Sequence, residues 1–193
     1  MILRTETDRD NLREGGRRLA TILHQASEKA AAGITLKEID AYILSLIEEY
    51  GNTPSFTGYG DPPFSGVFCL SVNDGIVHGI ANDYELIEGD VLKIDGGIWH
   101  EGLCTDSAIT VGIGTIAKED QELIWATKEA LDAQIAVAVA GNTIGDIGHA
   151  AEAIAKKHGY GYPKELGGHG VGLKVHEPPF IANYGKKGRG EVL

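Results

Sequence analysis

The stretch EGDVLKIDGGIWHEGLCTDSAITVG, residues 88–112, contains two apolar segments that are joined by the short polar run HEG. Residues 91–99 and 103–112 are rich in β-branched side chains, so we expect two strands that form an antiparallel hairpin. Each strand carries one aspartate, Asp95 or Asp106, among apolar neighbours. An ionised carboxylate in apolar surroundings must be paired, hydrogen-bonded or bound to a metal. The hairpin therefore predicts a functional site.

The loop of the hairpin decides how these two aspartates are related. A loop centred between His100 and Glu101 would place Asp95 directly opposite Asp106, and a loop centred between Glu101 and Gly102 would make them diagonal neighbours on one face. In both cases the like charges converge, and a cation between them would offset their repulsion. A three-residue loop would instead place them on opposite faces. The alternative without a metal is an antiparallel sheet with one acid on its solvent-exposed face.

Two histidines occur in GGHGVGLKVHEPP, residues 167–179, which is rich in glycine and proline. Glycines let the backbone bend and approach a ligand closely, and imidazoles can bind metals or handle protons. His169 and His176 are seven residues apart, so in a straight strand their side chains would point to opposite faces. Only a bend brings both to one site, and the alternative is that they are ordinary loop histidines.

A third histidine, His78, lies in SVNDGIVHGI, residues 71–80, just after a predicted strand and a turn. Alone it would be a surface loop residue. Two carboxylates and one imidazole suit a divalent ion that accepts hard oxygen ligands and tolerates nitrogen, such as Mn, Fe, Co or Zn. This donor set predicts metal-assisted hydrolysis.

The remaining chain alternates helical periodicity with strands. We expect helices over residues 8–32, from Thr35 onward with a capping box at Glu38, over 120–140 and over 143–157, and a strand within VFCLSVND, residues 67–74. AGITLKEI at residue 32 and AGNTIGDI at residue 140 match at a constant separation of 108. The repeat predicts a pseudo-duplicated α+β fold with a site between its halves.

The second half of this repeat should end in a strand pair equivalent to residues 91–112. Instead the sequence stops at GRGEVL, where Val192 and Leu193 have the composition of a strand that is just beginning. We therefore expect residues 1–193 to form a single catalytic-type domain that is incomplete at its C-terminus.

Composition limits the function classes. The chain has 193 residues, of which 42% are hydrophobic, and 17 basic against 28 acidic side chains give a net charge of -11. This charge argues against a nucleic-acid or anionic-membrane partner. No segment predicts a membrane span or a signal peptide, so we expect a cytoplasmic protein. The two cysteines, Cys69 and Cys104, lack metal-binding spacing and are expected to be reduced and near the core.

Together the motifs resemble type I methionine aminopeptidase, a member of the pita-bread metallopeptidase group that also contains prolidase, proline aminopeptidase and creatinase. The resemblance implies a pita-bread (creatinase/aminopeptidase-like) fold that lacks its last strands, and a methionyl aminopeptidase activity. No long insertion separates Asp106 from His169, which matches type I and not type II. The stretches that carry the resemblance are REGGRRLA, TPSFTGYG, SVNDGIVHGI, EGDVLKIDGGIWHEGLCTDSAITVG and GGHGVGLKVHEPP.

The resemblance also implies roles for individual residues. Asp95, Asp106 and His169 match ligands of a centre with two divalent ions, in which Asp106 would bridge the ions. His78 and His176 match histidines that contact the substrate, and His176 would help to polarise the scissile carbonyl and stabilise the tetrahedral intermediate. These two histidines are the predicted catalytic residues.

A pocket for the methionine side chain is implied next to this centre. Phe64, Cys69 and Tyr59 match positions near that pocket, and an adaptable apolar lining suits an unbranched thioether. The implied partners are the N-termini of nascent polypeptides, including those at the ribosome, and the implied oligomeric state is a monomer.

The sequence departs from the family pattern at two metal-binding glutamates, the first of which also serves as general base. Neither has a match here, and Glu191 does not fit by its context. We therefore expect weak metal binding and a turnover reduced by a further ~10²- to 10⁴-fold in this chain. Two alternatives stay open: a non-catalytic polypeptide-binding module on the same fold, and an Xaa-Pro peptidase, although the latter proteins usually carry an added N-terminal domain.

Overall fold

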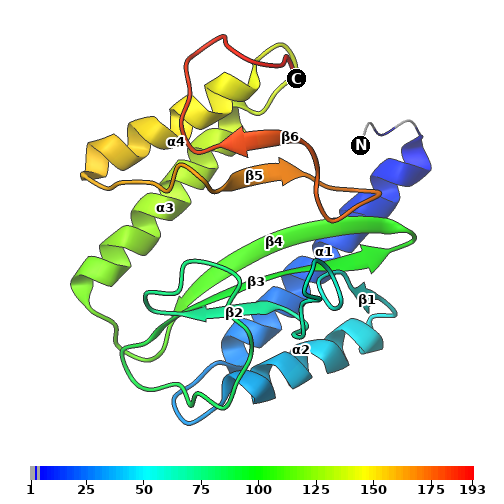
Figure 1. The fold of residues 1–193 in the computed structure, drawn as a ribbon, viewed down its shortest axis with the longest axis vertical. Coiled ribbons are helices and arrows are strands. Elements are labelled where there is room, and N and C mark those ends of the chain that lie inside the picture. Colours follow the sequence, from blue (N-terminus) through cyan, green and yellow to red (C-terminus); the bar gives the residue numbers. More distant parts are fainter. Residues whose placement is uncertain (1–2, 4) are drawn as a thin grey trace. The chain divides into compact units, whose positions relative to one another are not determined.

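A computed structural model describes residue 3 and residues 5–193 of the chain. Its contacts divide the chain into two compact units (Figure 1). The first unit contains Met1–Ala117 and Val171–Val175, and the second contains Lys118–Gly170 and His176–Leu193. The prediction of one catalytic domain over the whole chain stays a prediction, and the two units are described one at a time.

Two helices form one layer of the first unit. Helix α1 spans Glu6–Lys29 and helix α2 spans Leu36–Glu49, and both begin with a capping box, which Thr5 and Thr35 supply as N-caps. The capping box at Thr35 was predicted, whereas α1 begins two residues earlier and ends three residues earlier than its periodicity indicated. Because its sequence is amphipathic, each helix buries one apolar stripe. The stripes contain Leu19, Ile22, Leu23 and Ala26 in α1 and Ile39, Ile43, Leu46 and Ile47 in α2.

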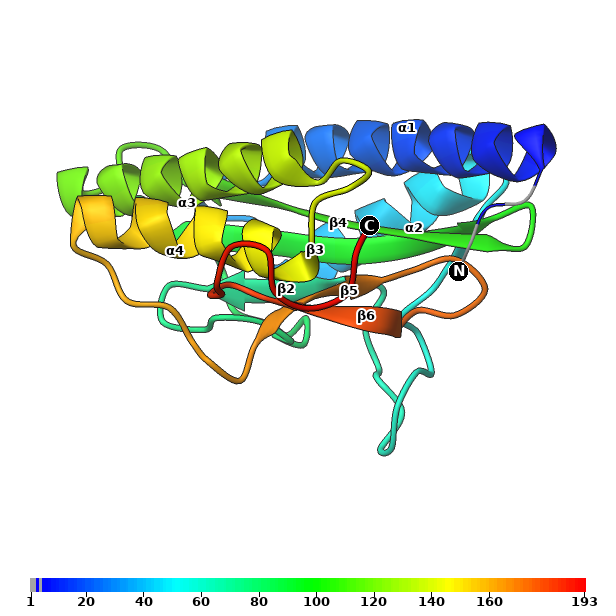
Figure 2. The same cartoon turned by 90° about the horizontal axis from the view of Figure 1, so that it is seen from above.

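A four-stranded antiparallel sheet forms the other layer. Its strands are β1 (Thr53–Pro54), β2 (Cys69–Val72), β3 (Val91–His100) and β4 (Leu103–Gly112). Strand β4 pairs with β3 over its whole length, so β1 and β2 pair with the opposite edge of β3. Helix α1 runs along β3 and β4 (Figure 2). Alternate residues of β3 therefore enter the core on this face, namely Leu92, Ile94 and Ile98.

The β3–β4 connection settles the alternatives left open by the sequence. Only Glu101 and Gly102 lie between the strands, and their φ angles of 48° and 77° are both positive. Positive φ at both positions is characteristic of a type I′ turn, whose twist matches that of the flanking strands. The loop is thus centred between Glu101 and Gly102, which makes the two aspartates diagonal neighbours.

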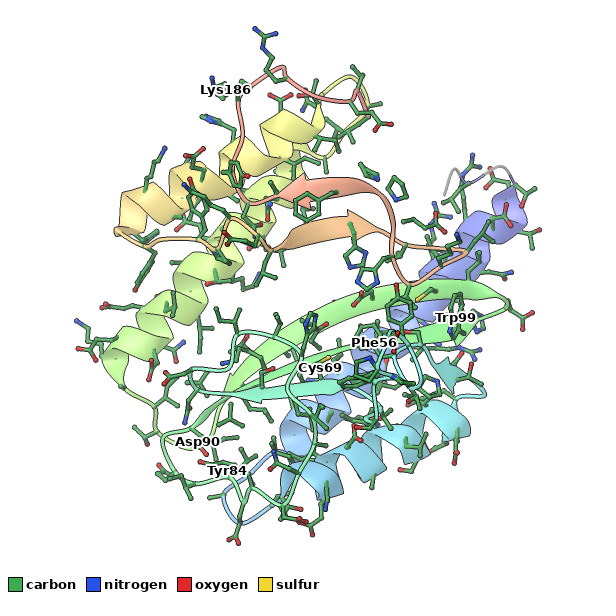
Figure 3. All side chains as sticks on the ribbon, in the orientation of Figure 1. Phe56, Cys69, Tyr84, Asp90, Trp99 and Lys186 are labelled. Carbon is green, nitrogen blue, oxygen red and sulfur yellow. The ribbon has the colours of Figure 1, made fainter. Side chains whose placement is uncertain are left out.

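A buried acid ties the entry of β3 to the loop before it. The Asp90 side chain is 3% exposed and accepts hydrogen bonds from Asn73 Nδ2 at 2.8 Å, Tyr84 Oη at 3.0 Å and the Ile87 N–H at 3.0 Å (Figure 3). Burial alone would raise the pKa of the Asp90 carboxyl, but the hydrogen bonds from Ile87, Asn73 and Tyr84 outweigh burial and hold this pKa below its usual range.

Replacing Asp90 with asparagine is expected to lower the free energy of unfolding at pH 7 by about 2 kcal/mol, because a charged acceptor surrounded by donors is lost. The pKa of Asp90 is lower in the folded than in the unfolded chain, where it is about 3.9. Its stabilisation is therefore present above about pH 4 and is lost as the pH falls through the folded value. Urea unfolding of both proteins from pH 7 to pH 3 measures this difference, and a constant difference over that range would contradict the assignment.

The second unit contains two helices and a two-stranded antiparallel sheet. Helix α3 spans Lys118–Val137 and helix α4 spans Ile144–His158, close to the predicted ranges. Strand β5 (Gly167–Gly170) pairs with β6 (Glu177–Ala182), and a register shift interrupts the pairing between His169 and Gly170. No helix in the described part of the chain is long and apolar enough to cross a membrane.

The predicted internal duplication is present within the two units. Helix α4 begins with a capping box between Thr143 and Asp146, which lies 108 residues after the box at Thr35 in α2. The N-cap threonines also form equivalent isolated bridges, Thr35 with Glu85 and Thr143 with Val192. Val192 thus forms one bridge of the kind that Glu85 forms before β3 in the first unit, and the strand expected to begin there stays a prediction.

Candidate metal centre

The two aspartates lie on the same face of the β3–β4 hairpin. Asp95 pairs with Ala108 and Asp106 pairs with Gly97 in the antiparallel register. The carboxylates therefore occupy two diagonal corners of a four-residue patch, and the small residues Gly97 and Ala108 occupy the other two. Diagonal neighbours in such a pair are about 7–8 Å apart, which leaves room for an ion between the carboxylates.

This face of the sheet is opposite to the one that packs on α1. Leu92, Ile94 and Ile98 alternate with Asp95 along β3 and are fully buried, whereas Asp95 and Asp106 are only partly buried. The burial pattern explains how two acids are tolerated in apolar strands, because their side chains do not enter the hydrophobic core. The same pattern also fits the alternative of a solvated sheet face, so the neighbouring residues decide what the pair can bind.

Cys69 is the neighbour of Asp95 on the other side of β3. It pairs directly with Asp95 from β2 and is 3% exposed. Burial, together with the nearby Asp95 carboxylate, raises the pKa of the Cys69 thiol to about 12. In the metal-free protein the thiol therefore stays protonated at neutral pH. The donors of this patch are carboxylate oxygens, which fit hard divalent ions such as Mn or Fe. Both cysteines are reduced and buried, as predicted.

His78 lies in the loop that follows β2. Its φ of 60° is in the left-handed region, and its side chain is exposed. The loop is held beside the strand by the Leu70 N–H, which donates to the carbonyl of Gly79 at 2.8 Å, and the backbone of His78 lies at the Cys69 thiol. The structure thus brings His78 to the same edge of the sheet as Cys69.

The predicted pocket residues Tyr59 and Phe64 belong to one closed loop. The N–H of Phe64 donates to the carbonyl of Tyr59 at 2.8 Å, and the N–H of Gly58 donates to the carbonyl of Phe64 at the same distance. Phe64 is partly buried, with its ring against Gly66, whereas Tyr59 is 45% exposed. Tyr59 is thus the more peripheral of the two.

Sequence analysis did not identify Phe56, whose ring lies next to Gly97 on β3. A Cβ atom on Gly97 would be 3.4 Å from the Phe56 ring, so this ring lies beside the small corner of the four-residue patch. Figure 3 labels Phe56, Cys69 and Trp99 in this part of the first unit. No motif singled out Phe56, because its position depends on the pairing of β1 with the distant strand β3.

The histidines at 169 and 176 are brought together within the second unit. Their ring centroids are 4.2 Å apart and the rings are tilted by 42°. The chain reverses between them, so that His169 on β5 lies close to His176 just before β6, as the predicted bend requires. The His169 Nδ1 is 3.0 Å from the carbonyl of Gly170, so a proton on this nitrogen would donate to that oxygen.

The predicted site residues thus form two groups, each described within its own unit. Asp95, Asp106, Cys69 and His78 belong to the first unit, and the two remaining histidines belong to the second. Among residue 3 and residues 5–193, no group of three or more His, Cys, Asp and Glu side chains is close enough to hold a metal ion. The three-ligand set of the prediction therefore stays a prediction.

Comparison with known proteins decides the family. Residues 10–193 match the model of metallopeptidase family M24. The chain belongs to this family. The family and its methionine aminopeptidase members support a hydrolase, and family membership implies dependence on divalent metal, in agreement with the oxygen donors of Asp95 and Asp106.

Individual M24 relatives agree with this assignment. A methionine aminopeptidase of Clostridium perfringens is 37% identical over 100% of this chain and 77% of its own length. The crystal structure of a methionine aminopeptidase from Rickettsia prowazekii superposes with a TM-score of 0.96 at 30% identity, over 100% of this chain and 77% of that one. A prolidase of Pyrococcus horikoshii shares the fold, with a TM-score of 0.85 at 24% identity over 100% of this chain and 52% of that one. The predicted pita-bread α+β fold is confirmed.

Proposed function

We propose that this M24 protein removes N-terminal methionine from polypeptides with the help of two divalent ions. The observation that carries the proposal is the diagonal pair of Asp95 and Asp106, which converge on one open face of a rigid hairpin. A rigid strand pair holds two ligands in a constant relation, which a metal centre needs. The 37% identity to a methionine aminopeptidase supports methionine as the residue that is removed.

In this proposal Asp95, Asp106 and His169 hold the ions, of which Mn, Fe, Co and Zn are the candidates. A bound ion would supply Lewis-acid polarisation of the scissile carbonyl. His176 would donate a hydrogen bond to the same carbonyl oxygen as it gains negative charge, and His78 would orient the peptide backbone. The proximity of His169 and His176, at 4.2 Å between centroids, supports a shared role for the two imidazoles.

The methionine side chain would lie against the apolar residues beside the aspartates. Cys69 is buried next to Asp95, and Phe56 covers the small corner at Gly97. Phe64 and Tyr59 would close the pocket from their loop. A protonated thiol and aromatic rings favour an unbranched thioether, because sulfur makes favourable contacts with aromatic edges.

The proposed partners are the N-termini of nascent polypeptides in the cytoplasm, including those at the ribosome, and the proposed oligomeric state is a monomer. The net charge of -11 supports a peptide rather than a nucleic-acid or membrane partner. The charge also favours attraction of the positively charged N-terminal amine of a substrate.

The test is release of methionine from Met-Ala-Ser by the 193-residue protein with Mn²⁺ or Co²⁺ added, compared with Leu-Ala-Ser and Ala-Pro. Slow release from Met-Ala-Ser is expected, because only three of the five implied ligands have a match in this sequence. Cleavage of Ala-Pro alone would contradict the proposal and favour an Xaa-Pro peptidase. Tight binding of Met-Ala-Ser without release or metal uptake would favour the non-catalytic binding module.

A further inference from the structure

The hydroxyl of Ser55 is a buried polar group that the fold does not use. Ser55 is 5% exposed, and its Oγ has no hydrogen-bond partner among the residues that the structure describes. Leaving a buried hydroxyl unpaired costs about 1–3 kcal/mol. Such a group needs an explanation, and its neighbours decide whether its partner is a ligand, an ion or an ordered water molecule.

The position of Ser55 next to β3 shows which residues its hydroxyl lies beside. The Ser55 N–H donates to the carbonyl of Gly97 at 3.0 Å, directly after the pairing of Pro54 with Ile98. The Ser55 hydroxyl lies over Gly97, in the space that a side chain at Gly97 would fill. Gly97 in turn pairs with Asp106. Ser55, Gly97 and Asp106 thus form one row across the sheet.

This row lies on the face that carries the aspartates. Because neighbouring strands are about 5 Å apart, a hydroxyl above Gly97 is within reach of the Asp106 carboxylate directly or through one water molecule. The glycine is essential to this arrangement, because any side chain at position 97 would occupy the space of the serine hydroxyl.

We propose that Ser55 is a positioning residue for the metal centre, whose hydroxyl donates a hydrogen bond, directly or through one water molecule, to the Asp106 carboxylate when an ion is bound. The inference rests on the proposed metal site. A hydrogen bond to a ligating carboxylate fixes the orientation of its oxygens, and loss of such a bond commonly weakens metal affinity by 10- to 100-fold. Ser55 acts through Asp106 and contacts neither substrate nor product.

The first unit offers a matched control. Thr105 Oγ1 is also buried and unpaired among the described residues, and Thr105 is 8% exposed. Thr105 pairs with Ile98, so its side chain faces α1 and not the aspartates, although it is adjacent to Asp106 in sequence. Thr105→Val therefore removes an equivalent hydroxyl from the opposite face of the same sheet.

The test compares Mn²⁺ affinity, measured by electron paramagnetic resonance, and thermal stability without metal for the wild-type protein, Ser55→Ala and Thr105→Val. Ser55→Ala is expected to bind Mn²⁺ roughly tenfold more weakly, with a metal-free melting temperature that is equal or higher, because no hydrogen bond of the fold is lost. Thr105→Val is expected to keep the wild-type affinity.

Each outcome bears on a different claim. Equal Mn²⁺ affinity in the wild type and Ser55→Ala would overturn the role of Ser55 and leave the proposed function intact. A clear drop in the metal-free melting temperature of Ser55→Ala would identify the hydroxyl as structural and overturn the inference. Failure of the wild-type protein to bind Mn²⁺ would overturn the proposed metal site and the inference together.

Discussion

Substitution of Asp106 by asparagine is expected to weaken Mn²⁺ binding by at least about a hundredfold and to abolish methionine release. Asparagine has nearly the same size and shape as aspartate, but it carries no charge and offers only one oxygen to an ion. Because Asp95 lies diagonally across the same face, the remaining carboxylate cannot replace the lost charge at the Asp106 corner. Calorimetric titration with Mn²⁺ and the Met-Ala-Ser assay measure the two effects.

The stability of the metal-free protein separates this effect from misfolding. Removing one of two converging negative charges relieves repulsion, so the metal-free Asp106→Asn protein is expected to be at least as stable as the wild type. The exposed Asp10 on α1, replaced by asparagine, serves as the control for charge alone. Unchanged Mn²⁺ affinity in Asp106→Asn would show that the hairpin is only a solvated sheet face.

Replacing Gly96 with alanine is expected to lower the free energy of unfolding by about 3 kcal/mol. The side-chain position of Gly96 points into the core face of β3, where an added Cβ would overlap the ring of Phe68, which is 0% exposed. The ring cannot move aside without displacing other core residues, because protein interiors are close-packed. Urea denaturation followed by circular dichroism measures the loss.

Two further variants identify the cause of this loss. Gly16 on α1 has no atoms within 4 Å of its Cβ position, so Gly16→Ala is expected to stabilise the protein by about 0.5–1 kcal/mol. In the Phe68→Ala background, Gly96→Ala is expected to cost much less than in the wild type, because the overlapping ring is gone. Equal costs in both backgrounds would mean that the clash with Phe68 is not responsible.

The helices show how far local sequence can reach in this protein. The capping box of Thr35 with Glu38 and the apolar stripe through Ile39 and Ile43 predicted α2, because caps and periodicity involve residues within one or two helical turns. The repeat at a separation of 108 predicted a second such helix, and α4 begins with its own capping box. Helix ends were less accurate, since tertiary packing decides where the last turn frays.

The site shows where local sequence stops being informative. Composition placed Asp95 and Asp106 on a hairpin, but the choice between opposite and diagonal pairing depended on which two residues formed the turn. The short strand β5, with only four residues that include three glycines, has no periodicity to predict it. The sequence showed that His169 and His176 can share a site only if the chain bends between them, but it did not predict that the bend forms.

The sequence by itself determined the fold family, the hairpin with its two acids and the amphipathic helices, because each of these depends on neighbours along the chain or on recognisable motifs. Only the tertiary structure decided which residues from other loops lie beside this part of the hairpin. Ser55 and Phe56 lie beside Gly97, which pairs with Asp106, only because β1 pairs with β3, more than forty residues further along the chain. A long-range pairing of this kind leaves no periodic signal in either segment, since its energy comes from contacts that exist only after the chain has folded.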